Sequence, residues 1–123
     1  MALSYQYDLE KNRVLTRASG TVTTGDMLQY IEILLEDNRI KRGFIEIVNF
    51  EAVEDLVVTY SEIDPFPSIW EKYRQQGCKT VVIYAPNDFS FGTFRMLQTV
   101  VLLRHEEDPF IVVRSQEKLN AVL

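Results

Sequence analysis

The spacing of hydrophobic and polar positions alternates along the chain between a period of two and a period of three to four. Tyr5, Tyr7 and Leu9 alternate with polar residues, which is the pattern of a half-buried strand. A second short apolar run, Val14–Ala18, follows a polar turn. The two segments therefore predict a β-hairpin that ends at Gly20.

A helix is predicted to follow this hairpin. Thr23 and Thr24 can cap its start, and Asp26 in the first turn suits the positive end of the helix dipole. Apolar residues then recur at helical spacing and form one wide stripe: Met27, Leu28, Ile31, Leu34 and Leu35. The run Phe44–Val48 predicts a third strand. The acids and scattered apolar residues of 49–60 predict an irregular loop.

The second half of the chain repeats the alternation of helix and strand. A second helix is predicted to start near Asp64 and Pro65 and to end at Gly77. The apolar run in the next strand indicates burial on both faces, as in a parallel sheet covered by helices. The remaining predicted elements are that strand at Thr80–Ala85, a helix over 89–104, a strand at Phe110–Val113 and a last helix capped by Ser115.

The order of elements is strand, strand, helix, then three further strand–helix pairs. Strands that alternate with helices imply crossover connections and a mainly parallel sheet, and the opening hairpin adds an antiparallel edge. A chain of 123 residues is long enough for one domain with its own core. We therefore expect a single α/β domain over residues 1–123 with a mixed, mostly parallel sheet.

Composition excludes several classes of function. The net charge of −5 argues against nucleic-acid binding and against purely electrostatic attachment to anionic lipid. A single cysteine, Cys78, rules out an internal disulfide and suits a reducing cytoplasm. We find no apolar run long enough to span a membrane and no signal-peptide pattern at the start.

Several short sequence motifs resemble those of the STAS-like proteins related to the anti-sigma-factor antagonist SpoIIAA. They are Gly20–Thr23, Phe44–Asn49, Gly77–Thr80, Ser115–Leu119 and, most distinctively, Phe91-Gly92-x-x-Arg95-Met96. The resemblance covers nearly the whole chain. It implies a five-stranded mixed sheet with four helices, and a bacterial cytosolic branch for whose members ligand binding and membrane association have been proposed.

The best-known members of that group are phosphorylation switches, with an acceptor serine or threonine at the tip of the third strand. Phosphate there adds charge that blocks or permits partner docking. The matching stretch in this chain, residues 48–51, contains no hydroxyl. Thr59 and Ser61 lie further along and are the alternative acceptors. This departure weakens a partner-switching interpretation, which stays as the second hypothesis.

Aromatic residues form the candidate ligand site. Ligands of open α/β sheets bind beyond the carboxyl ends of the strands, where the loops after the third and fourth strands leave the sheet. Arg95 is a candidate for an anionic head group, and a surface ion pair is the alternative. The predicted cleft lies between the second and third helices and comprises Phe50, Phe66, Trp70, Tyr73, Phe89, Phe91 and Arg95. Ordinary core packing is the alternative for the aromatic residues.

The sequence contains no catalytic motif, so we expect neither an enzyme nor a cofactor. The lone histidine, His105, precedes three acids, but the spacing does not converge ligands on a metal ion. Our leading hypothesis is a noncatalytic binding module for a small apolar or amphipathic molecule. We also expect a cytoplasmic location with peripheral membrane contact, and consider a homodimer held by exposed apolar residues.

Overall fold

The computed structural model describes residues 2–62, 64–102 and 110–122. Its first two strands, β1 (Leu3–Asp8) and β2 (Arg13–Thr23), form the predicted antiparallel hairpin, in which Tyr5 pairs with Thr16. The chain reverses at Asn12, whose φ of 53° lies in the left-handed region that asparagine tolerates better than most residues.

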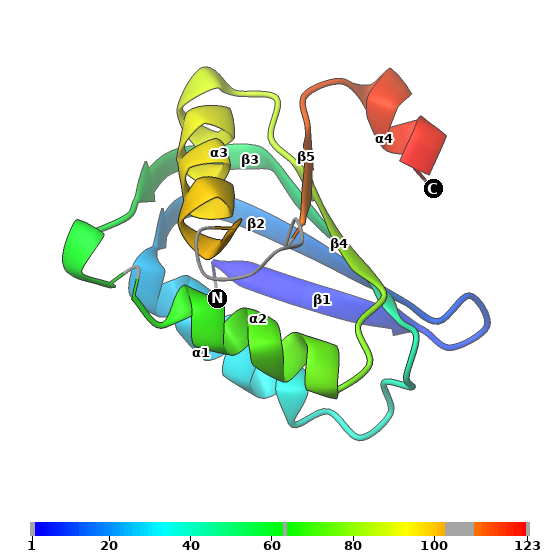
Figure 1. Ribbon diagram of the computed structural model, residues 1–123. Coiled ribbons are helices and arrows are strands. Elements are labelled where there is room, and N and C mark those ends of the chain that lie inside the picture. The colour runs from blue at the N-terminus through cyan, green and yellow to red at the C-terminus, as the bar shows by residue number, and fades with distance from the viewer. Residues whose placement is uncertain (1, 63, 103–109, 123) are drawn as a thin grey trace.

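Three further strands extend the sheet from β2. These are β3 (Ile45–Val57), β4 (Thr80–Tyr84) and β5 (Ile111–Val113), each parallel to its neighbour in the order β1-β2-β3-β4-β5 (Figure 1). The predicted five-stranded, mostly parallel mixed sheet with four helices is confirmed.

Two strands are longer than predicted. β2 continues through Gly20 to Thr23, and β3 continues to Val57, so the prediction of an irregular loop over 49–60 was wrong. The pairing of β2 with β3 shifts register between Arg17 and Ser19 and again between Gly20 and Thr21. Such bulges interrupt the alternation that marks a strand. Beyond Asn49, β3 also has no pairing to β4. Many side chains in this part of the strand are exposed and polar.

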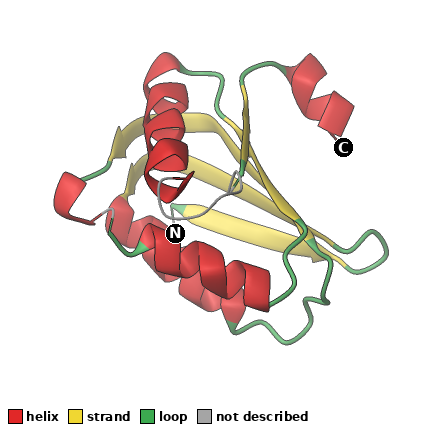
Figure 2. Ribbon diagram, viewed as in Figure 1, coloured by secondary structure: helices red, strands yellow, loops and turns green. Residues whose placement is uncertain are grey.

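Three helices cover one face of the sheet, and the fourth lies on the opposite face (Figures 1 and 2). They are α1 (Thr24–Leu35), α2 (Phe66–Gln75), α3 (Asp88–Leu102) and α4 (Gln116–Val122), with a short 3-10 turn at Tyr60–Glu62 before α2. The main core lies between the sheet and α1–α3. On the other face, Leu119 of α4 packs against Ile47, Val82 and Tyr84.

Local signals place the ends of the helices. Thr23 accepts a hydrogen bond from the Asp26 amide, and Asp26 accepts one from the Thr23 amide, which completes a capping box. After α2, Gly77 adopts a φ of 86°, the left-handed conformation that commonly ends a helix. The start of α2 departs from expectation, because Pro65 occupies the cap position with no side-chain cap bond.

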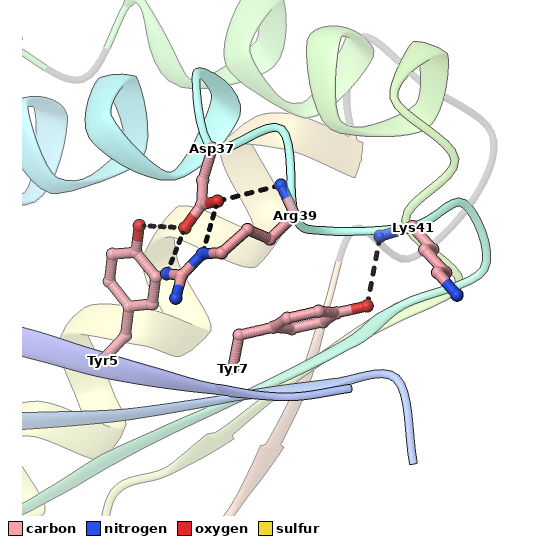
Figure 3. A network of polar contacts seen from close by, with 5 residues as sticks. All are labelled: Tyr5, Tyr7, Asp37, Arg39 and Lys41. Carbon is pink, nitrogen blue, oxygen red and sulfur yellow. Dashed lines mark hydrogen bonds and ion pairs between the residues drawn. The ribbon is translucent and has the colours of Figure 1, made fainter. Parts of the chain in front are cut away.

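A polar network ties the connection between α1 and β3 to the edge strand β1 (Figure 3). Tyr5 donates to Asp37 at 2.8 Å, and the Arg39 guanidinium donates to both Asp37 oxygens at 3.0 and 2.6 Å. The amide of Lys41 donates to the Tyr7 hydroxyl at 3.2 Å. The Arg39 guanidinium beside Asp37 holds the pKa of that carboxyl well below its usual range. These contacts hold the connection between α1 and β3 against β1, which is a structural role.

Candidate functional site

A cavity of about 90 Å³ lies between the sheet and helices α1–α3. Its floor is formed by alternate residues of β3 and β4, whose side chains point to the helical face, and its walls come from all three helices. Its surface is almost wholly carbon. The lining comprises Leu3, Met27, Tyr30, Ile31, Glu46, Val48, Phe50, Phe66, Ile69, Trp70, Tyr73, Val81, Ile83, Phe94, Leu97 and Phe110.

The structure brings four of the predicted site residues together in this lining. Phe50 projects from β3, and Phe66, Trp70 and Tyr73 lie on α2. Trp70 and Tyr73 are spaced to share one helix face. The cavity sits within the layer between helices and sheet, whereas the predicted cleft lay beyond the carboxyl ends of the strands.

The other three predicted residues lie on α3 outside the cavity lining. Phe89 is 43% exposed. The half-buried ring of Phe91 lies under the Arg114 guanidinium, 4.8 Å from the ring centroid. Arg95 is exposed and donates to the side-chain oxygen Oε1 of Gln98 at 2.9 Å. These residues do not share one pocket with Trp70.

A buried glutamate at the cavity is the feature that sequence reasoning missed. Glu46 of β3 is 2% exposed, and its Oε2 accepts hydrogen bonds from the hydroxyls of Tyr30 and Tyr73, the latter at 3.4 Å. Tyr30 also contacts the Thr16 hydroxyl at 2.5 Å. A signal was present, because Glu46 is the one acid inside the apolar run 44–48, and an acid is almost never fully buried unless it is paired.

Burial dominates the electrostatics of Glu46. Removal from water disfavours the charged form and raises its pKa to about 7, against the lowering effect of the Tyr30 and Tyr73 hydrogen bonds. Among the described residues, no cation acts on this carboxyl. Both tyrosines have a pKa raised well above the ordinary value, chiefly by burial. The tyrosines therefore stay neutral, and Glu46 is the group here that titrates near neutral pH.

Cys78 lies at the exit from α2 and has no feature of a nucleophile. Its thiol is half-buried and donates to the Thr80 carbonyl at 3.5 Å. Burial, followed by the nearby Glu46 carboxyl, raises the pKa of the thiol to about 12. A thiol in that state is unreactive at neutral pH, since the thiolate is the nucleophile.

Two buried polar atoms in the described part of the chain have no hydrogen-bond partner: Trp70 Nε1 and Ser90 Oγ. Such atoms are rare in folded proteins, because each one costs the free energy of its lost hydration. Trp70 belongs to the cavity wall, while Ser90 lies in the first turn of α3. The wall that contains Glu46 thus also contains a buried indole N–H without a hydrogen-bond partner among the described residues.

The two predicted phosphate acceptors follow the true end of β3. Because the strand reaches Val57, its tip is followed by Thr59 and Ser61, both of them exposed. The Thr59 amide donates to the Thr24 hydroxyl at 3.2 Å, which fixes the connection against the start of α1. The stretch 48–51, which lacks a hydroxyl, is mid-strand, so taking it as the strand tip was wrong.

Within residues 2–62, 64–102 and 110–122, no three histidine, cysteine or acidic side chains are placed to hold a metal ion. His105 and the acids after it lie outside these ranges. In the same part of the chain, no helix combines the length and hydrophobicity needed to cross a bilayer.

Solved structures with the same arrangement of elements were found. The chain matches the anti-sigma factor antagonist SpoIIAA in its unphosphorylated form with a TM-score of 0.57 and 11% identity, over 98% of this chain and 96% of that one. It has a SpoIIAA-like fold. An uncharacterized protein from Shewanella loihica with the SpoIIAA-like fold matches at a TM-score of 0.54 and 12% identity, over 99% of this chain and 92% of that one.

The phosphorylated form of the Bacillus cell fate determinant SpoIIAA matches at a TM-score of 0.51 and 13% identity, over 98% of this chain and all of that one. No protein-family model and no curated protein sequence matches this chain. The SpoIIAA-like fold implied by the short sequence motifs is thus confirmed by the structural matches. At 11 to 13% identity this likeness concerns the fold alone.

Proposed function

We propose that this chain is a noncatalytic binding module that holds one small apolar or amphipathic molecule in the cavity between the sheet and helices α1–α3. The cavity itself is the observation that supports the proposal. A concave site with a mostly apolar lining and few polar groups is typical of small-molecule binding. Packing alone does not favour such a void, because a cavity in a core lowers stability.

The size of the cavity limits the ligand. A cavity of about 150 Å³ lined by aliphatic and aromatic residues binds benzene or xenon, and the volume here is about 90 Å³. A ligand of about benzene size therefore requires a modest shift of wall side chains. Phe66 and Ile69 of α2 are half-buried members of the wall, as are Ile31 and Phe110, so these side chains can move at a lower cost in packing than the buried ones.

Binding is tested by titrating the isotope-labelled protein with xenon, benzene and cyclopentane while amide and methyl NMR shifts are recorded. We expect saturable shifts for residues of α2, β3 and β4 around the cavity. The variant Ile69→Trp fills the cavity and should abolish these shifts. Ser68→Trp places the same side chain on the exposed side of the same helix and should leave them unchanged. Absence of saturable binding of all three probes overturns the proposal.

A second candidate function is a partner-switching domain. The observation in its favour is the exposure of Thr59 and Ser61 just beyond the tip of β3. SpoIIAA, which shares the fold, has been solved in unphosphorylated and phosphorylated forms. Incubation with a bacterial anti-sigma kinase and labelled ATP tests this function. The partner-switching function requires that the wild type incorporates labelled phosphate and that the Thr59→Ala, Ser61→Ala double variant does not. Absence of incorporation into the wild type rejects this function.

Dimerisation and membrane contact are separate proposals that draw on the apolar residues of α3, of which Phe89 is exposed. Light scattering of wild type and Phe91→Asp tests the dimer: a wild-type monomer, or a mass that the substitution leaves unchanged, counts against it. Sedimentation with neutral and with anionic vesicles tests the membrane proposal, and recovery of all protein in the supernatant with both rejects it.

A further inference from the structure

Glu46 is the polar group through which the cavity can recognise a ligand. It lies in the cavity lining, is buried, and accepts both of its hydrogen bonds on one oxygen, Oε2. The other oxygen, Oε1, receives no hydrogen bond from the described residues. Nearly all of the remaining lining is carbon, so one carboxyl oxygen has two hydrogen-bond donors and the other has none among the described residues.

The protonation state follows from this asymmetry. An ionised carboxylate in an apolar wall is costly unless a cation compensates it, and no cation of the described residues acts on Glu46. The carboxyl therefore favours the neutral acid below about pH 7. Because Tyr30 and Tyr73 donate to Oε2, the acid proton belongs on Oε1, where no described residue accepts it. An O–H with no acceptor in the protein can donate a hydrogen bond to a ligand.

We propose that Glu46 donates a hydrogen bond to the bound molecule, and that the ligand is a small apolar compound carrying one acceptor oxygen, such as a ketone, aldehyde or ether. This inference rests on the proposed binding function. The inference adds the chemical class of the ligand to that function, since a purely hydrocarbon ligand would leave the Glu46 O–H unpaired. A cationic amine is the opposing class, because it would pair with the ionised carboxylate.

The groups that face Glu46 allow this interpretation to be tested by pH. Tyr30 comes from α1 and Tyr73 from α2, Thr16 of β2 contacts the Tyr30 hydroxyl, and Cys78 lies near the exit of α2. All four are neutral at pH 7. Glu46 therefore controls whether the cavity offers a donor or a negative charge.

The test compares cyclopentanone with cyclopentane and cyclopentylamine, three molecules of similar size, by NMR titration at pH 5.5 and pH 8.5. At pH 5.5 we expect cyclopentanone to bind about tenfold more tightly than cyclopentane. At pH 8.5 this preference should disappear, because the carboxylate cannot donate. Glu46→Gln keeps a donor in the same place, so it should retain the preference at both pH values, and Glu46→Met should lose it at both.

The outcomes separate this inference from the proposed function. Equal binding of cyclopentanone and cyclopentane at pH 5.5 overturns the ligand class while the binding module stands. Tighter binding of cyclopentylamine than of cyclopentanone at pH 5.5 also overturns it. Binding of none of the three overturns both proposals. If Glu46→Met does not fold, the pH comparison in the wild type and in Glu46→Gln still decides the question.

Discussion

Glu46→Gln should remove a pH dependence from the free energy of unfolding, because the glutamine cannot ionise. A pKa of about 7 in the folded protein, against the ordinary 4.5, corresponds to about 3 kcal/mol of unfolding free energy. Below pH 4.5 the acid is protonated in both states and its burial carries no charge penalty. Between pH 4.5 and 7 the unfolded chain releases the proton first, so rising pH favours unfolding. Above pH 7 both states are ionised and the loss is complete.

The assay is urea unfolding of wild type and Glu46→Gln at pH values from 4.5 to 8.5, followed by the fluorescence of the single tryptophan, Trp70. The glutamine keeps an acceptor for Tyr30 but cannot ionise. We expect the wild type to lose about 3 kcal/mol relative to the variant across this range, at about 1.4 kcal/mol per pH unit where the slope is steepest. The variant should become the more stable protein near neutral pH.

Glu54→Gln is the matched control, because Glu54 is an exposed acid on the same strand. It should stay within about 0.5 kcal/mol of the wild type. A difference between wild type and Glu46→Gln that does not vary with pH would refute the reasoning. So would a wild type that gains stability relative to the variant as pH rises, since either result means that the buried carboxyl is ionised at little cost.

Four further predictions concern local features of the fold. Gly77→Ala should lower stability by about 1 kcal/mol or more in urea unfolding, because φ is 86° and the new Cβ would lie 2.9 Å from Arg42 Cβ. Gly92→Ala is its counterpart within α3: apart from the adjacent helix backbone, no atom of the described residues lies within 4 Å of the added carbon, so stability should rise by up to about 1 kcal/mol. Thr23→Ala removes the α1 capping box and should lower the free energy of unfolding by about 1 kcal/mol. In thermal unfolding followed by circular dichroism, the variant should lose its helical signal at a lower temperature than the wild type. Cys78, with its pKa raised to about 12, should react with a thiol reagent at pH 8 far more slowly in the folded protein than in urea, and equal rates would contradict the assigned burial.

The order of elements could be predicted from sequence because each signal is local. An alternating strand such as Leu3–Asp8, a cap such as Thr23 and a helix-ending Gly77 are defined by neighbours within a few residues. The far half of β3 carries no such signal. Its strand conformation depends on pairing with residues 19–23 of β2 across register shifts, so only the tertiary structure shows it.

Sequence reasoning predicted that the aromatic residues Phe66, Trp70 and Tyr73 lie together, from their placement on one helix and the expected position of that helix on the sheet, and the structure places all three in one cavity lining. It could not show that Phe89 lies outside the cavity, because the rotation of α3 about its own axis decides which side chains face the core. Nor could it pair Glu46 with the tyrosines. Those contacts join residues far apart in the chain, and the loss of water that raises the glutamate pKa exists only once three helices close over the sheet.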